Sequence, residues 1–227
     1  MRKFLLITLN ILCVGGYVYC QEITKQEIVA NWSSVKKTLT MQEILSQIEN
    51  KDVDSAINNL KNKNIDTFIF FKVASIGAIK KNNSPNYRCY LFWQSNGKFF
   101  AQLFTDKMTS LSILIDDSPL MSFFIENNDK LKDDYIMPPI YSAKKVGAKI
   151  EYESGIQFHD DNYIIFCQLG KKLKSIQFGQ SYLNDEKSLF YLDNISTFSF
   201  HWFTIAEAEI KLLKKSFSDN IVTTKPQ

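Results

Sequence analysis

His159 and the two acids that follow it are the residues of this chain whose types and spacing best fit proton-transfer chemistry. The sequence contains two histidines, and histidine is the side chain that changes charge near neutral pH. In His159-Asp160-Asp161 the imidazole could act as a general base that Asp160 or Asp161 orients. A polar β-turn explains the same residues better, because aspartates favour turns through their own hydrogen bonds. His159, Asp160 and Asp161 are therefore the catalytic candidates of an alternative hypothesis, an envelope hydrolase.

The acidic pairs of the sequence do not predict a metal site. Asp116-Asp117, Asp133-Asp134 and Asp160-Asp161 could supply oxygen ligands, but the sequence lacks the loop pattern of an EF-hand calcium site. A zinc site needs three or four converging ligands, and no second cluster of His, Cys or Asp has suitable spacing. Solvated loop charge is the better explanation of these pairs. We predict no metal and no cofactor.

Cys89 and Cys167 are the cysteines that remain when Cys13 and Cys20 are assigned to an N-terminal signal. Both lie within apolar runs that read as strands, an environment that raises a thiol pKa and disfavours a nucleophilic role. In an exported protein the pair is compatible with a single disulfide. Two buried thiols that act as small apolar side chains fit equally well. A disulfide requires Cα atoms within about 7 Å, a distance that the sequence does not contain.

A stretch near residue 140 is the candidate binding segment. Met137-Pro138-Pro139-Ile140-Tyr141 cannot be a central strand, because two prolines remove two hydrogen-bond donors. Its apolar side chains, Met137, Pro138, Pro139 and Tyr141, could contact a ligand or a partner. The competing interpretation is a loop packed on its own core.

The nearest match to a serine-hydrolase elbow is Gly179-Gln180-Ser181-Tyr182-Leu183. The motif of that family has a second glycine two residues after the serine, which permits the sharp turn from strand to helix. Leu183 occupies that position here. We therefore assign no nucleophile to Ser181.

The charge balance argues against a nucleic-acid partner. The chain has 27 basic and 24 acidic residues among 227, a net charge of +3. Arg2 and Lys3 belong to the N-terminal signal, so the mature chain carries 25 − 24 = +1. Without a strong positive field neither nucleic acid nor an anionic membrane surface is a predicted partner. The abundance of Lys, Asn and Ile is typical of an AT-rich bacterial genome.

The N-terminus resembles a cleaved secretory signal peptide. A basic start at Arg2-Lys3 precedes an apolar run, Phe4–Val14, and short residues stand at Val18 and Cys20. The apolar run is shorter than the roughly 20 residues of a membrane span. We predict signal residues 1–20, cleavage between Cys20 and Gln21, and no transmembrane anchor in the mature chain. A lipoprotein anchored through Cys20 is the less favoured alternative, because bulky Tyr19 precedes that cysteine.

Residues 87–106 predict a central hairpin. Asn96-Gly97 joins two apolar runs, and this pair favours the type I′ turn of a two-residue hairpin loop. Such a loop places Trp93 opposite Phe100 and Cys89 opposite Phe104, on one face. Both faces of the hairpin are apolar, so it should be covered on both sides. Trp93 and Phe100 are accordingly predicted to be core residues.

The remaining patterns predict one α+β domain over 21–227, with a mostly antiparallel sheet built around the hairpin. Capping-box spacing at Thr24–Glu27 and Thr40–Glu43 predicts two helix starts, and a third helix begins near Asp52. From residue 149 onward, a second set of strands with one polar face is expected to help cover the hairpin. The predicted segments are a helical layer at 21–62, a strand-rich region at 65–202 that includes a polar loop at 127–134 and strands at 189–192 and 197–202, an amphipathic helix at 203–217, and a tail at 218–227.

These observations favour a soluble, exported protein without enzymatic activity, which acts in the periplasm or outside the cell. Its expected role is to bind an unidentified protein or small molecule of the cell envelope, or to serve as an accessory to such a partner. The signal peptide and the lack of a recognisable catalytic constellation carry this hypothesis.

Overall fold

The computed structural model describes residues 23–35, 39–48, 50–75, 86–132, 134–155 and 160–222. These residues form two compact units, one comprising helix α2 (Lys25–Val35) with Ser142–Glu153, and the other comprising the described parts of Lys36–Tyr141 and Ser154–Gln227. The larger unit contains the whole main sheet and is described first. That residues 21–227 form a single domain stays a prediction.

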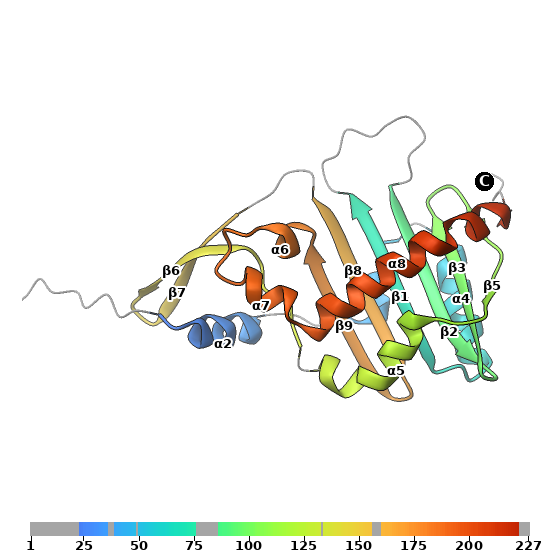
Figure 1. Ribbon diagram of the computed structural model, residues 1–227, viewed down its shortest axis with the longest axis horizontal. Coiled ribbons are helices and arrows are strands. Elements are labelled where there is room, and N and C mark those ends of the chain that lie inside the picture. Colours follow the sequence, from blue (N-terminus) through green and yellow to red (C-terminus); the bar gives the residue numbers. More distant parts are fainter. Residues whose placement is uncertain are drawn as a thin grey trace, which may run out of the picture. The chain divides into compact units, whose positions relative to one another are not determined.

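An antiparallel sheet of eight strands organises the larger unit (Figure 1). Strand β1 (Thr67–Ser75) lies between β2 (Tyr87–Ser95) and β8 (Asp161–Leu169). The other strands extend the sheet on either side: β3 (Lys98–Thr105), β4 (Thr109–Ser110), β5 (Ile113–Ile115) and β10 (Ile221–Val222) beyond β2, and β9 (Lys172–Gly179) beyond β8. This architecture confirms the predicted α+β fold.

The predicted hairpin is present with its predicted register. Trp93 pairs with Phe100 and Cys89 with Phe104 across β2 and β3. Asn96 and Gly97 both have positive φ, 51° and 72°, as a type I′ turn requires. Trp93 is buried, and its ring stacks on that of Phe100 with centroids 5.5 Å apart.

Helices α3 (Met41–Leu45) and α4 (Lys51–Asn62) cover one face of the sheet, which we call the α4 face. The predicted capping box forms, with the Thr40 hydroxyl accepting from Glu43 N and the Glu43 carboxylate accepting from Thr40 N. Asn50 caps α4 and also donates to Thr105 O at 2.7 Å, so that the start of α4 is tied to β3. The buried side chains of α3 and α4 pack against alternate residues of the strands, including Phe68, Phe70, Leu91 and Phe166.

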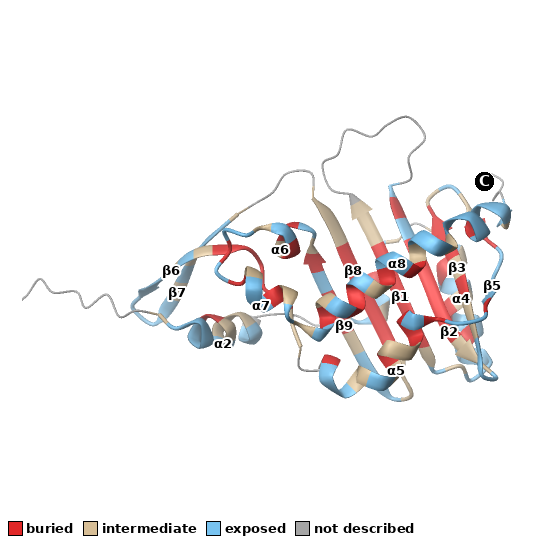
Figure 2. Ribbon diagram, in the orientation of Figure 1, coloured by how far each residue is buried: buried red, intermediate tan, exposed pale blue. Residues whose placement is uncertain are grey.

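Helices α5 (Pro119–Lys132) and α8 (Phe198–Asp219) cover the opposite face, which we call the α8 face (Figures 1 and 2). The N-terminus of each helix is bound by a carboxylate that lies on or next to the other helix. Glu209 of α8 accepts from Ser118 Oγ and Leu120 N at the start of α5. Asp134, just beyond α5, accepts from Ser199 N at the start of α8. Two short helices, α6 (Ser181–Asn184) and α7 (Tyr191–Ile195), precede α8.

Several segment predictions were wrong. Residues 197–202 were predicted as a strand because Phe198, Phe200 and Trp202 alternate, but Thr197 caps α8 and these residues form its first turns. Residues 189–192 run into α7, and most of the predicted loop 127–134 belongs to α5. The later strands do not cover the hairpin, because β8 and β9 extend the same sheet.

The smaller unit contains α2 and most of a two-stranded hairpin, β6 (Ile140–Val146) and β7 (Lys149–Ser154). The predicted capping box of α2 forms between Thr24 and Glu27. Asn31 of α2 donates a hydrogen bond to the hydroxyl of Tyr152 in β7. Within the described residues of the whole chain, no helix combines the length and the apolar character that crossing a membrane requires.

Candidate functional site

The predicted catalytic residues are only partly placed, since His159 lies outside the described residues. The Asp160 carboxylate accepts hydrogen bonds from Ser181 N, at 3.1 Å, and from Ser181 Oγ, at 2.6 Å. Asp161 begins β8. The Asp160 carboxylate therefore stabilises the turn between β9 and α6.

Ser181 is the first residue of α6 and follows the end of β9 by two residues, close to where a nucleophile elbow would place its serine. Ser181 is 5% exposed, and its hydroxyl donates a hydrogen bond to the Asp160 carboxylate. Gly179 is needed for that contact, because a Cβ there would meet the Asp160 carboxylate at 2.3 Å. The glycine and the serine thus explain the packing of this turn.

The candidate binding stretch is packed into the core. Met137 is fully buried, and Pro138 and Pro139 are buried with it. Met137 N donates to the side chain of Asn194 at 2.8 Å, and the amide of Asn194 returns a bond to Met137 O. Tyr141 is half-buried and donates to Asp185 at 2.6 Å. The packed-loop interpretation describes these residues.

Of the two alternatives that the sequence left open for Cys89 and Cys167, the structure has two buried free thiols and no disulfide between them. Cys89 lies opposite Lys72 of β1, whereas Cys167 lies opposite Ile69. Positions three apart on a strand point to opposite faces, so the sheet separates the two sulfurs. Burial raises the pKa of each thiol to about 12. Neither cysteine therefore has the thiolate character that a nucleophile requires.

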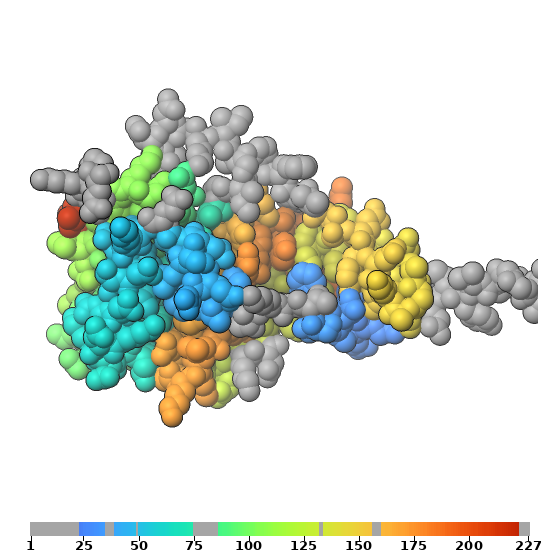
Figure 3. Space-filling model, turned by 180° about the vertical axis from the view of Figure 1, so that it is seen from behind, coloured from blue at the N-terminus to red at the C-terminus, as the bar shows by residue number. Residues whose placement is uncertain are grey.

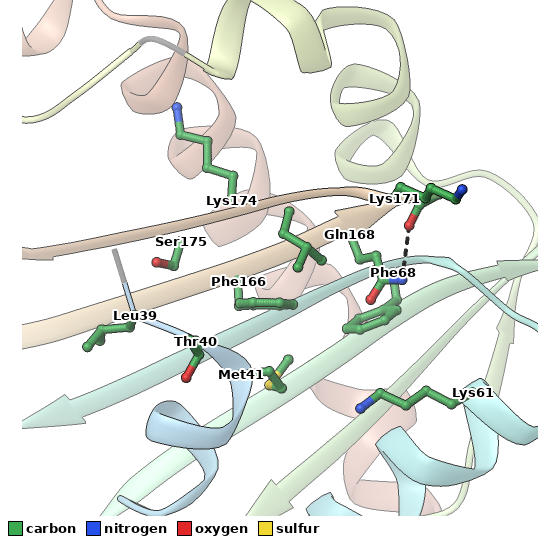
Figure 4. A pocket seen from close by; sticks show the side chains of 12 residues that line it. Leu39, Thr40, Met41, Lys61, Phe68, Phe166, Gln168, Lys171, Lys174 and Ser175 are labelled. Atoms are coloured by element: carbon green, nitrogen blue, oxygen red, sulfur yellow. Dashed lines mark hydrogen bonds between the residues drawn. The ribbon is translucent and has the colours of Figure 1, made fainter. Parts of the chain in front are cut away.

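A cavity of about 560 Å³ lies on the α4 face, over the β8–β9 end of the sheet. Its floor consists of side chains that share this face on three strands: Phe68, Phe166, Gln168, Leu173 and Ser175. The Phe68 and Phe166 rings stack with centroids 6.1 Å apart. The start of α3 supplies one wall through Leu39, Thr40 and Met41 (Figure 4).

This cavity exists because α3 and α4 do not reach across the whole sheet. Figure 3 shows both helices over this face, with the β8–β9 turn visible below them. Leu173, in the edge strand β9, remains 62% exposed at the lip of the cavity. An apolar side chain left uncovered beside a concave apolar surface is a feature of ligand sites.

The charges around the cavity have one sign. Among the described residues that line it, Lys61, Lys171 and Lys174 are basic and none is acidic. Lys61 extends from α4 toward Met41 and Phe68, whereas Lys174 points away and donates to Asp134 O at 3.0 Å (Figure 4). Lys61 is therefore the cation best placed to meet a bound ligand, and Lys171 stands at the outer edge.

Sequence reasoning missed this cavity because its residues come from five separate elements. One local signal was present: Leu173 stands between Lys172 and Lys174 in a strand where the charged neighbours indicate a solvent-facing edge. Across the described chain, no group of three or more His, Cys, Asp or Glu side chains is placed to hold a metal ion. The chemistry of the cavity is therefore that of apolar contact and positive charge.

Comparison with known proteins adds no functional information. No protein-family model matches the sequence, and no similar chain is found among curated proteins or among solved structures.

Proposed function

We propose that this chain is a non-enzymatic binding protein whose ligand is an apolar molecule with an anionic end. The observation that carries the proposal is the cavity on the α4 face, which combines an aromatic and aliphatic lining with lysines and without carboxylates among its described residues. Its volume lies in the range of small-molecule sites, about 300–1,000 Å³. A fatty acid is the simplest ligand with this chemistry.

The lining supports this ligand class energetically. Contact with Phe68, Phe166 and Leu173 would remove hydrocarbon from water, a gain of about 0.8 kcal/mol for each buried CH₂ group. A carboxylate near the exposed Lys61 would add a contribution of only about 0.2–1 kcal/mol, because water screens the pair. Apolar contact therefore determines affinity, and Lys61 determines the preferred charge.

The alternative, an envelope hydrolase that uses His159 with Asp160 or Asp161, has less support. The Asp160 carboxylate is occupied by Ser181, and no observation on the described residues favours the reaction. Export through a cleaved signal peptide, with cleavage after Cys20, remains part of the proposal and rests on the N-terminal sequence alone.

Isothermal titration calorimetry with three ligands of equal chain length tests the proposal. Dodecanoate should bind more tightly than dodecanol, and dodecanol more tightly than dodecyltrimethylammonium, each used below its micelle concentration. Binding of the cationic ligand equal to that of dodecanoate would remove the role of the lysines. A lack of binding by all three would refute the proposed function.

Two variants with matched controls locate the site. Leu173→Asp places a charge at the apolar lip and should weaken dodecanoate binding about tenfold or more, while Leu192→Asp, at a leucine 71% exposed on α7, should have no effect. Lys61→Glu should weaken binding about 3- to 10-fold, whereas Lys63→Glu, two residues further on, should not. Equal effects of a variant and its control would place the ligand elsewhere.

A further inference from the structure

A second cavity, of about 390 Å³, lies on the α8 face between α8 and the sheet. Aromatic side chains from three elements line it: Phe71 of β1, Tyr90 of β2 and Phe217 of α8. The Phe71 and Tyr90 ring centroids are 6.4 Å apart, and those of Tyr90 and Phe217 are 5.8 Å apart. The cavity can therefore hold an apolar group.

Acidic groups gather on the β8 side of this cavity. Asp161 and Tyr163 come from β8 and Glu207 from α8. Glu207 is exposed, but desolvation at the cavity and the charge of Asp161 raise the pKa of its carboxyl group, while the neighbouring Tyr163 hydroxyl lowers it. Burial also raises the pKa of Tyr163, and the charges of Glu207 and Asp161 raise it further. These mutual effects indicate that the three groups lie close together.

Basic groups gather on the opposite side. Arg88 comes from β2, and Lys211 and Lys214 follow Glu207 along α8. In the described part of the chain, none of these three cations forms an ion pair. Arg88 and Tyr163 both pair with Val73 of β1. They therefore point to the same face, one on each side of β1.

The two sides of the cavity leave room for a ligand that carries both charges. Strands β2 and β8 are second neighbours across β1, so their backbones lie roughly 9–10 Å apart. An α-amino acid has its nitrogen and carboxyl carbon about 2.5 Å apart. With a charged hydrogen bond of about 3 Å at each end, the side-chain atoms that hold its two charged groups stand about 8–9 Å apart, a distance that side chains on β2 and β8 can bracket.

We propose that this cavity is a second binding site, which takes a free α-amino acid with an apolar side chain. The ammonium group faces Glu207 and Asp161, the carboxylate faces Arg88 and Lys214, and the side chain lies among the aromatic rings. This site is on the other face of the sheet from the proposed fatty-acid cavity, and it stands or falls independently of that function.

Three probes with the same phenylethyl skeleton test the proposal by titration calorimetry on the purified protein at neutral pH. L-phenylalanine carries both charges, phenethylamine only the positive one, and 3-phenylpropanoate only the negative one. L-phenylalanine should bind at least tenfold more tightly than either of the others. Equal binding of all three, tighter binding of 3-phenylpropanoate, or no binding of any probe at millimolar concentration would overturn the proposal.

Two substitutions assign the ends of the ligand. Glu207→Gln should weaken L-phenylalanine and phenethylamine about tenfold and leave 3-phenylpropanoate unchanged. Arg88→Gln should weaken L-phenylalanine and 3-phenylpropanoate and leave phenethylamine unchanged. Lys214→Gln, at an exposed position of α8, repeats the second test if the Arg88 variant unfolds at a lower temperature. Equal loss of all three probes in every folded variant would contradict the assigned orientation.

Discussion

The two faces of the sheet are made from the same strands but are covered and anchored differently. On the α4 face, two short helices pack over part of the sheet, and the neutral amide of Asn50 ties α4 to β3. On the α8 face, two carboxylates join the two longer helices: buried Glu209 of α8 accepts from the start of α5, and half-buried Asp134, just after α5, accepts from the start of α8. The alternation of side chains along a strand lets one sheet support two such environments.

This difference has a consequence for where ligands can bind. The α4 face leaves an uncovered apolar cavity beside lysines. The α8 face leaves a cavity in which acidic and basic groups oppose each other across β1. Incomplete cover produces an apolar site on one face, and the charges of α8 produce a polar one on the other.

The largest expected effect tests how the two cores compare. Phe70 and Phe71 are neighbours in β1, both buried, and they point to opposite faces. Truncation of either to alanine should cost about 3–5 kcal/mol. Phe71→Ala should cost about 1 kcal/mol more, because its ring contacts three others, Tyr90, Tyr163 and Phe203. Urea unfolding of both variants measures the difference, and a greater loss at Phe70 would reverse the ranking of the faces.

The next effect concerns the carboxylate that joins α5 to α8. Glu209→Gln should cost about 1–3 kcal/mol, because the amide cannot accept from both Ser118 and Leu120 as the carboxylate does. Burial raises the pKa of Glu209 above its ordinary value of 4.5. The folded state then binds the proton more tightly than the unfolded state, so the stability contributed by Glu209 falls as pH rises from 4.5 through the raised pKa.

The difference in stability between the wild type and Glu209→Gln should therefore be greater at pH 4 than at pH 7 by urea unfolding. Glu186→Gln makes the same chemical change at an exposed position and should shift stability by less than about 0.5 kcal/mol. A pH-independent difference would show that the pKa of Glu209 is the same in the folded and the unfolded state.

A smaller loss of stability is expected from a change in the β2–β3 turn, because these two strands contribute side chains to both faces of the sheet. Gly97 has φ = +72° and no atom near its missing Cβ, so Gly97→Ala should cost about 1–2 kcal/mol through backbone strain alone. Gly147 has φ = +63° and equally open surroundings, but it lies in the β6–β7 turn of the smaller unit. Gly147→Ala should leave the unfolding midpoint of the main sheet unchanged, and an equal shift in both variants would contradict this separation.

The smallest effect is an expected lack of reaction. One cysteine lies on each face, and with a pKa of about 12 each thiol is ionised to only about one part in ten thousand at pH 8. Iodoacetamide should label neither Cys89 nor Cys167 in the folded protein and both in urea, as measured by mass spectrometry. Labelling of one cysteine without denaturant would show that its face opens locally.

Features that depend on residues close together in the chain were predicted correctly, whereas features that depend on contacts between distant residues were not. The register of β2 and β3 was predicted correctly because it depends on Asn96-Gly97 and on the alternation of residues next to that turn. The strand predicted at 197–202 was wrong because alternating aromatics are ambiguous. The capping hydroxyl of Thr197 and the burial of Trp202 against Phe124 select the helix.

By itself, the sequence determined the fold class, the central hairpin and the helix starts at Thr24 and Thr40, since these depend on hydrogen bonds and periodicity within a few residues. Tertiary structure alone decided that Cys89 and Cys167 are on opposite faces, that Met137 is buried, and that two cavities form. Those outcomes depend on which strands become neighbours and on how far the helices extend over them. Contacts between residues distant in the chain set both, and no local pattern contains them.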